Sequence, residues 1–395
     1  MSSRGREVVI AGASRTPIGS FQGSLASVTA PRLGAIAIRA ALAQAGVSPD
    51  RVDEVWMGNV LSSGLGQAPA RQAALYGGLP QGAPATTVGK VCGSGLAAII
   101  QGVRSILLED AEVVVAGGME SMSNAPYLLP KARAGYRLGH GAVVDSLLFD
   151  GLWDPYGDFH MGCAAEWCAR HFAVSREAQD AYARESYRRA LEAQERGWFE
   201  REIAEVPVGE GQKAMTVSVD EEPGRAKLDR MAELRPAFEA DGTITPASAS
   251  KISDGASAVV LAEAKTAERM NLRPLARVVS YGGHAQAPDR WATAPIYAIR
   301  RALERAGLSP ADVDLFEINE AFAVVSMVCA RELAVDLSQV NVRGGAVALG
   351  HPIGASGARV VTTLVHALSD LGLARGVASL CLGGGEALAI VVERA

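Results

Sequence analysis

The chain has 395 residues, more than one compact core usually holds, so two or three domains are expected. Apolar residues make up 49% and charged residues 21%, which is typical of a soluble globular protein. A net charge of -5 argues against a nucleic-acid-binding surface. No run approaches the ~18 apolar residues of a membrane span, so no membrane partner is expected. The first residues, MSSRGREVVIAG, lack the apolar core of a signal peptide.

The cysteines argue against a disulfide framework and against a zinc ribbon. They are odd in number, widely scattered, and form no C-x-x-C pair. We therefore expect no metal site and a reducing, cytoplasmic location. The five are Cys92, Cys163, Cys168, Cys329 and Cys381.

The sequence contains an internal duplication. AIRAALAQAGVSPDRVD (residues 37–53) and AIRRALERAGLSPADVD (residues 298–314) are identical at 11 of 17 positions without a gap. Each copy predicts an amphipathic helix that ends at Gly46 or Gly307. A Ser-Pro turn and an apolar strand follow, EVWMG in the first copy and LFEIN in the second.

A weaker repeat extends this duplication. CGSGLAAII precedes the strand AEVVVAGGME, and GASGARVVTTLV precedes GVASLCLGGGEA. Each of these two pairs of segments predicts a small-residue turn, an apolar helix and a strand that ends in glycines. Strands such as VVIAG and EVVVAGG are apolar throughout, which indicates burial on both faces. We expect an α/β protein built from two related halves.

The stretch from about residue 121 to residue 250 has no counterpart in the second half. It is richer in aromatic and charged residues, and it contains a predicted helix that ends at Gly197. We interpret 121–250 as an inserted loop domain, 1–120 with 251–270 as the N-terminal half, and 271–395 as the C-terminal half. An insertion at the carboxyl end of a strand is a common position for a binding cap.

Cys92, in KVCGSGLAA, lies directly before a predicted helix. Unpaired N–H groups and the positive end of the helix dipole would lower the pKa of its thiol from ~8.5 and favour the thiolate. Gly93 and Gly95 would let another backbone or a substrate approach closely. Cys92 is therefore a candidate nucleophile; the alternative is a small buried cysteine.

A nucleophilic thiol needs a base, and His351 is the candidate among six histidines because ALGHPIGASG places it on a rigid turn. Cys381 ends a predicted strand and is followed by three glycines. Asn319 and Glu320 follow the second-half strand, where a polar pair could meet a substrate carbonyl. G-x-S-x-G and G-x-x-x-x-G-K-[ST] do not occur, which argues against a serine hydrolase and a P-loop.

Five motifs, taken in chain order, resemble those of the thiolase family: KVCGSGL, GGMESMSNAPY, NEAFA, GGAVALGHPIGASGAR and CLGGG. The resemblance runs from ASRTPIGSF near the N-terminus to the last strand, and it is closest to the short-chain branch. It implies a thiolase-like five-layered αβαβα fold made of two duplicated halves, with an inserted loop domain.

The resemblance also implies a reaction. This is the reversible Claisen condensation of two acetyl-CoA to acetoacetyl-CoA and CoA through an S-acyl-cysteine, with CoA thioesters as substrates and no permanently bound cofactor. Cys92 would take the acyl group, His351 would activate it, and Cys381 would remove or return the α-proton of the second acyl-CoA. Asn319, through a water, would join His351 in holding the thioester oxygen. The N–H groups of Cys92 and Gly383 would form a second oxyanion site.

Coenzyme A contacts are implied in the inserted segment. His160 and Met161 resemble the segment that touches pantetheine, and Ser250 matches a family serine. Leu234 would lie near the adenine, and Arg225 could meet a phosphate. The segment YLLPKARAGYRLGHG resembles the family's tetramerisation loop and implies a homo-oligomer, a tetramer or else a dimer.

Four positions depart from the family pattern. Ala68 and Arg343 stand where Asn is usual, Lys251 stands where Gly is usual, and Glu386 stands where an apolar residue is typical. Lys251 could meet a CoA phosphate, but a solvated loop residue is the favoured interpretation.

Three other functions remain open from sequence. The first is a 3-ketoacyl-CoA thiolase that accepts longer chains. The second is a decarboxylating ketoacyl synthase, which would need a second catalytic histidine where this chain has Cys381. The third is a non-catalytic CoA-binding scaffold, which the presence of every proposed catalytic residue disfavours.

Overall fold

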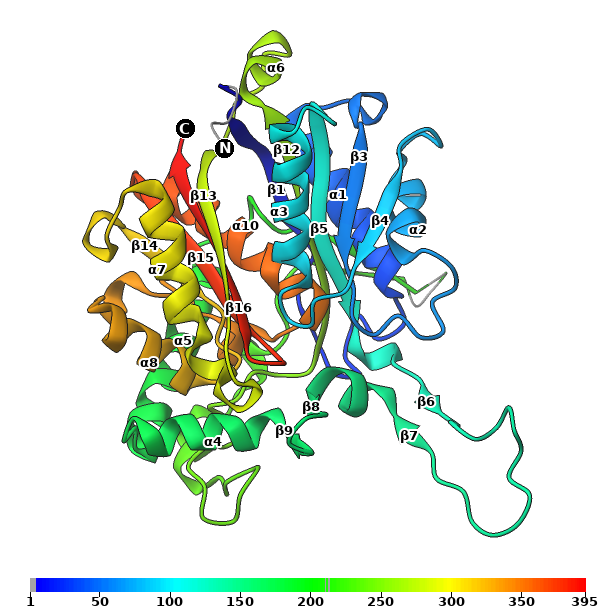
Figure 1. Ribbon diagram of the computed structural model, residues 1–395, viewed down its shortest axis with the longest axis vertical. Helices are drawn as coiled ribbons and strands as arrows, with labels where there is room; N and C mark the ends of the chain where they lie inside the picture. The colour runs from blue at the N-terminus through cyan, green and yellow to red at the C-terminus, as the bar shows by residue number, and fades with distance from the viewer. Residues whose placement is uncertain (1–4, 210, 212–213) are drawn as a thin grey trace.

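The computed structural model describes residues 5–209, 211 and 214–395 (Figure 1). The first half contains β1 (Val8–Arg15), β2 (Gly19–Ser20), α1 (Ala30–Ala45), β3 (Glu54–Gly58), α2 (Pro69–Tyr76), β4 (Ala85–Val88), α3 (Ser94–Leu107) and β5 (Val113–Ser121). The second half, entered through β12 (Ser253–Glu263) and α6 (Ala264–Arg269), contains β13 (Ala276–Ala285), α7 (Ala294–Ala306), β14 (Leu315–Ile318), α8 (Ala323–Leu333), α9 (Ala346–Leu349), α10 (Ile353–Leu371), β15 (Arg375–Leu382) and β16 (Glu386–Arg394).

The sheet topology repeats in the two halves. In the first half β3 lies parallel to β5, which pairs antiparallel with β12, which pairs antiparallel with β1. In the second half β14 lies parallel to β15, which pairs antiparallel with β16, which pairs antiparallel with β13. The halves join where Val8–Ile10 of β1 pairs with Ala276–Val278 of β13. The predicted duplication is confirmed.

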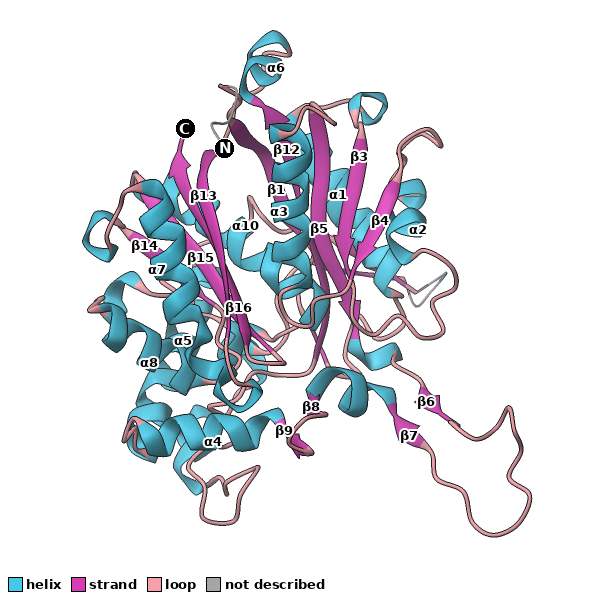
Figure 2. Cartoon of the chain, viewed as in Figure 1, coloured by secondary structure: helices cyan, strands magenta, loops and turns pink. Residues whose placement is uncertain are grey.

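The helices form layers around these strands (Figures 1 and 2). Helices α3 and α10 pack against each other between the two sets of strands, α3 on β5 and β3, and α10 on β5, β12, β14 and β15. Helix α1 covers the outer face of β1 and β12, and α7 covers β13 and β16. This arrangement is the five-layered αβαβα fold that the sequence predicts.

Glycines allow the two central helices to touch backbone to backbone. A Cβ on Gly95 of α3 would lie 2.8 Å from the main-chain nitrogen of Ala358, and one on Gly357 of α10 would lie 2.4 Å from that of Leu96. Both contacts are too close for any larger residue. The expected close approach at Gly95 is therefore real, and it fixes the helix behind Cys92 against the helix behind His351.

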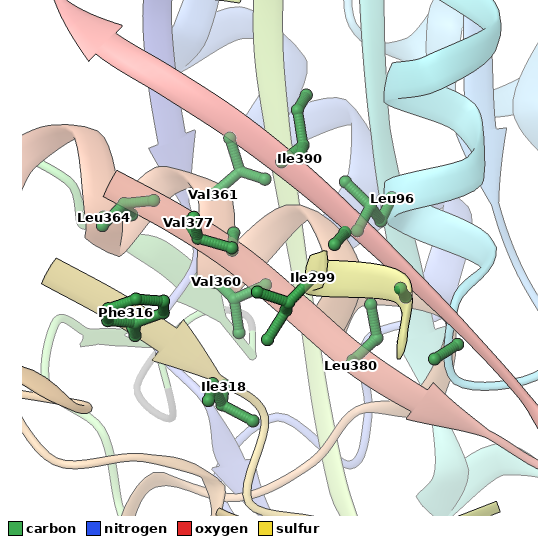
Figure 3. Close-up of a cluster of buried hydrophobic side chains, with 14 of the residues drawn as sticks. Leu96, Ile299, Phe316, Ile318, Val360, Val361, Leu364, Val377, Leu380 and Ile390 are labelled. Carbon is green, nitrogen blue, oxygen red and sulfur yellow. The ribbon is translucent and has the colours of Figure 1, made fainter. Parts of the chain in front are cut away.

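The largest apolar core lies between α3, α7, α10 and the strands of the second half. Figure 3 shows Leu96, Ile299, Phe316, Val360 and Leu380 pointing into it from these elements. All of β5 and β12 is buried, as apolar strands covered on both faces should be. Packing on both faces therefore fixes the central strands of the fold.

Residues 122–252 leave the sheet after β5 and return to it at β12, the direct neighbour of β5. They contain β6 (Tyr127–Leu128), β7 (Val144–Asp145), β8 (Trp153–Asp154), β9 (Phe159–His160), α4 (Met161–His171), α5 (Arg176–Glu195), β10 (Val206–Val208) and β11 (Met215–Val217). Helices α4 and α5 pack on α8, so this segment of the first half covers the second half. The β6–β7 hairpin extends away as an arm (Figure 1). The division into three domains at the stated boundaries stays a prediction.

The helix predicted to stop at Gly197 is α5, which ends at Glu195, with Gly197 in the left-handed region at φ 68°. Helices α1 and α7 end at Gly46 and Gly307 as predicted, with φ of 68° and 69°. Across the part of the chain that the structure describes, none of the helices is both long enough and apolar enough to span a lipid bilayer.

Candidate active site

Cys92 lies on a strained turn between β4 and α3. Val91, directly before it, has φ 46°, a conformation that β-branched residues avoid. Ser94 holds this turn, because its Oγ accepts from the N–H of Lys90 at 2.8 Å and donates to the carbonyl of Val91 at 2.7 Å. Local hydrogen bonds thus offset the strain. The turn places the Cys92 thiol just before the first turn of α3.

Cys92 opens into an apolar cavity of about 200 Å³. The cavity lies between the two halves and the segment 122–252, and its lining is mostly hydrophobic and aromatic, as in most small-molecule sites. Six of the predicted site residues line it: Cys92, His160, Met161, Ser250, His351 and Gly383.

Burial decides the protonation of the Cys92 thiol. The main-chain N–H groups of Gly383 and of Cys92 itself lower its pKa, but burial outweighs them and raises it to about 11. The expectation that the helix start yields a ready thiolate is therefore wrong, because desolvation of the thiolate costs more than the helix end returns. A nucleophilic Cys92 would therefore need a base.

His351, the predicted base, lines the same cavity as Cys92. Its side chain is buried, and its Nδ1 lies 2.5 Å from Oγ of Ser356, which in turn donates to the carbonyl of Pro352 at 3.0 Å. Because that hydroxyl proton is used, Nδ1–H donates to Ser356 and the Nε2 lone pair is left free. Among the residues that the structure describes, none is a hydrogen-bond partner of Nε2. Burial, and then the charge of Arg359, lower the pKa of His351 to about 3, so the ring is neutral.

Asn319 follows β14 and is fully buried beside His351. Its Nδ2 lies 3.5 Å from His351 Nδ1, and its Oδ1 has no hydrogen-bond partner within the described part of the chain. The N–H of Asn319 donates to the carbonyl of Ser379 in β15, which fixes the residue at the sheet edge. Asn319 is therefore brought to the histidine, although it is not among the residues that line the cavity.

Cys381 is buried near the end of β15, and burial raises the pKa of its thiol well above the usual value. The segment around Cys381 packs against the segment around Cys92: a Cβ on Gly93 would lie 2.4 Å from the side chain of Leu382, and one on Gly383 would lie 3.3 Å from that of Val91. The three glycines that follow Cys381 form the tight turn into β16, with Gly384 and Gly385 both at φ 84°.

A second hollow of about 360 Å³ adjoins the first, and Lys251 lines both. Leu234 lies there, as predicted for an adenine contact, together with Lys227 and Arg230, which the sequence did not single out. Arg225 lines neither hollow; its guanidinium pairs with Glu221 at 3.0 Å, so its predicted phosphate contact stays a prediction.

Three of the four departures have partners in the structure. The ammonium of Lys251 is not solvated as expected: it donates to three main-chain carbonyls, and burial lowers its pKa to about 8. Glu386 pairs with Lys90, two residues before Cys92. Arg343 donates to the carbonyl of Trp198 and pairs with Asp370 at 2.5 Å.

Sequence reasoning missed the aromatic lining and the residues that support the site. Phe238, Trp291 and Phe322 line the cavity, but aromatic residues scattered over the chain give no local signal. Ser356 could have been found, since it lies on the first turn of the helix that follows His351. Glu120 accepts from Asn59 and from the N–H groups of Val60, Leu61 and Gly354.

Metal chemistry receives no support from the described residues 5–209, 211 and 214–395. No group of three or more His, Cys, Asp or Glu side chains there is arranged to hold a metal ion. The arrangement instead joins a thiol, a neutral imidazole with a free nitrogen, a second thiol and main-chain N–H donors around an apolar cavity. Such a set can form and resolve a thioester.

Comparison with known proteins agrees with this geometry. Residues 8–265 match the family model "Thiolase, N-terminal domain", and residues 272–394 match "Thiolase, C-terminal domain". A probable acetyl-CoA acetyltransferase of Dictyostelium discoideum is 50% identical over 98% of this chain and 94% of its own length. An acetyl-CoA acetyltransferase of Pseudomonas aeruginosa is 48% identical, covering 98% and 100%. One of Gibberella zeae, described as cytosolic, is 47% identical, covering 98% of each. The chain belongs to the thiolase family.

Proposed function

We propose that the protein is an acetyl-CoA acetyltransferase, which condenses two acetyl-CoA to acetoacetyl-CoA and CoA or runs the reverse thiolysis. The observation that carries the proposal is the convergence of Cys92, His351 and Gly383 on one apolar cavity, with Cys381 in β15 two residues before Gly383. The names and near-complete overlap of the relatives support the same activity.

In the first step Cys92 takes the acetyl group. His351 Nε2 accepts the thiol proton as sulfur attacks the thioester carbonyl, and it returns that proton to the departing CoA sulfur. The developing oxyanion needs donors that point to it before the reaction begins. We assign one such oxyanion site to the N–H groups of Cys92 and Gly383, both of which already interact with the Cys92 sulfur.

In the second step Cys381, once its own proton has passed to solvent, acts as a thiolate and removes the α-proton of a second acetyl-CoA. The enolate carbon then bonds to the acetyl carbonyl, the bond to Cys92 sulfur breaks, and the proton on Cys381 passes to Cys92. We assign the enolate oxygen to Asn319, acting through a water, and to His351, which can donate to that oxygen only when it carries a proton on Nε2.

The two hollows together suit coenzyme A. The apolar cavity with His160, Met161 and Ser250 would take the pantetheine end, and the hollow with Leu234 and Arg230 would take the nucleotide end. The names of the relatives favour the short-chain reaction over a long-chain 3-ketoacyl-CoA thiolase. Rates measured with acyl chains of increasing length would decide between them.

Intact mass after mixing with acetyl-CoA, followed by peptide mapping, tests the chemistry. We expect one acetyl group, on Cys92, in the wild type. Cys381→Ala should still be acetylated but should lose condensation, and Cys92→Ala should lose both. Near-normal turnover by Cys381→Ala would refute the two-thiol mechanism. A folded protein that takes no acyl group from acetyl-CoA or from longer donors would instead favour a CoA-binding scaffold.

We also propose a cytoplasmic location and a homo-oligomeric state, a tetramer or else a dimer. The scattered cysteines suit a reducing compartment. The exposed arm supports association and is considered below. Fractionation of the source cells would test the location.

A further inference from the structure

Lys251 is bonded in an unusual way for a lysine beside an active site. Its Nζ donates to the carbonyls of Pro246 at 2.6 Å, Ala249 at 2.7 Å and Val347 at 3.3 Å. An ammonium group has three donors, so these contacts leave none for a ligand phosphate. The ring of Tyr187 lies 5.7 Å away, within reach of a cation–π contact. Three main-chain oxygens around one half-buried positive charge form a cation site filled by the chain itself.

No carboxylate pairs directly with this ammonium among the ion pairs of the described residues. Glu222 and Glu320 act on it only from a distance, where they raise its pKa against the effect of burial. The carboxylate of Glu320 is itself held by Tyr182, Ser186 and Asn341. The carbonyl oxygens are therefore the direct ligands of the charge.

The three carbonyls belong to two segments that meet at the catalytic histidine. Pro246 and Ala249 lie in the loop that carries Ser250, and Val347 lies in α9, four residues before His351. The main chain of Lys251 makes a second link, because its carbonyl accepts from the N–H of His351 at 3.0 Å. The side chain and the main chain of Lys251 thus connect the substrate loop to the histidine loop.

We infer that Lys251 is a positioning residue that acts as a tethered monovalent cation, clamping the Ser250 loop to the His351 loop through three carbonyl oxygens. The inference rests on the proposed function, since it concerns the same site. Main-chain carbonyls bind K⁺ in place of its hydration shell, and ammonium is a cation of the same charge. The intact protein should therefore need no free alkali cation.

Removal of the side chain turns this site into a vacant one with a definite ligand preference. Lys251→Ala leaves three carbonyl oxygens that converge on a space of about the volume of the lost amine, which K⁺ or NH₄⁺ can enter. Lys251→Met fills much of the same space without a charge, so a cation cannot enter. Lys265→Ala, on the exposed surface of α6, is the matched control.

The experiment measures kcat, KM for acetyl-CoA and Tm in tetramethylammonium, sodium, potassium and ammonium chloride at constant ionic strength. We expect the wild type and Lys265→Ala to be indifferent to the cation. In tetramethylammonium, Lys251→Ala should lose about 10- to 100-fold in kcat, because small displacements of catalytic groups are that costly. K⁺ or NH₄⁺ should restore most of that loss and raise its Tm, and neither should rescue Lys251→Met.

Wild-type kcat in Lys251→Ala without K⁺ or NH₄⁺ would overturn the inference. So would a loss that neither cation changes in kcat or in Tm. If Lys251→Ala is unfolded in tetramethylammonium, folding on addition of K⁺ supports the cation site, and failure to fold with it refutes the site. If the wild type has no acetyltransferase activity, the proposed function fails, but the effect of K⁺ on Tm still decides whether the carbonyls bind a cation.

Discussion

At the level of single residues, burial sets the chemistry of the catalytic pair. It raises the pKa of the Cys92 thiol to about 11 and lowers that of His351 to about 3. Both shifts favour the neutral forms, so a preformed thiolate–imidazolium pair is disfavoured. In the proposed mechanism the proton therefore moves to His351 as the sulfur attacks.

The pH dependence of Cys92 alkylation tests this account. A thiol reacts as its thiolate, and a raised pKa moves the rise in reactivity to higher pH. Without substrate, the rate with iodoacetamide should increase about tenfold per pH unit from pH 7 to pH 9.5 and should not level off. Peptide mapping assigns the label to Cys92, and Cys92→Ser gives the background. A plateau near pH 7 or 8 would mean that the pair is already ionised.

Ser356 should matter for kcat rather than for binding. It accepts from Nδ1–H of His351 and so keeps the Nε2 lone pair free. Ser356→Ala removes this constraint on the tautomer, and we expect kcat to fall about 10-fold or more, the order found when a group that orients a catalytic residue is lost. KM for acetyl-CoA should change little. Ser356→Thr keeps the hydroxyl and serves as the control; equal kcat in Ser356→Ala and wild type would contradict the role.

At the level of elements, the sequence patterns that correctly predicted helix ends and strands were local ones. The Gly46 and Gly307 helix ends and the strand EVWMG are found where they were predicted, because a left-handed glycine and an apolar run act within a few residues. Cys92 and His351 were found because glycines and a proline mark their turns. The aromatic lining of the cavity, and Val347 with the Lys251 loop, come from segments far apart in sequence, and only the folded chain brings them together.

Helix α2 begins with a local conflict that a substitution should relieve. Ala68 is its N-cap residue and has φ 49°, in the left-handed region, with no side-chain cap. Asn tolerates this conformation and can accept from a free N–H of the first turn. Ala68→Asn should stabilise the protein by about 0.5–1 kcal/mol, measured by denaturant unfolding. Ala68→Gly relieves the backbone conflict without adding a side-chain cap, so its free energy of unfolding gives the backbone contribution alone. An Ala68→Asn variant that is less stable than the wild type would contradict the argument.

At the level of the whole molecule, the sheet topology ties function to the duplication. Each half contributes a helix and the ends of its strands, and the nucleophile comes from one half while His351, Asn319 and Cys381 come from the other. Weak internal similarity predicted the two halves, but it could not predict that α3 and α10 meet between them. That meeting depends on small residues in two helices that are more than 250 positions apart.

The β6–β7 arm should hold chains together. Only Tyr127–Leu128 and Val144–Asp145 pair within it, and such a short hairpin is marginal by itself in water. Leu138 at its tip is fully exposed, and Leu129 and Val143 are 55% and 60% exposed. An isolated chain would leave these side chains in water, whereas a patch of this kind usually marks an interface.

We expect light scattering to find a particle of four chains for the intact protein, and a smaller one when residues 130–142 are replaced by a short Gly-Ser linker. The catalytic residues lie outside the arm, so the shortened protein should still take an acetyl group on Cys92. Leu108→Ser removes an exposed leucine at the end of α3, outside the arm, and should leave the particle size unchanged. An unchanged particle after loss of the arm would show that another surface holds the chains together.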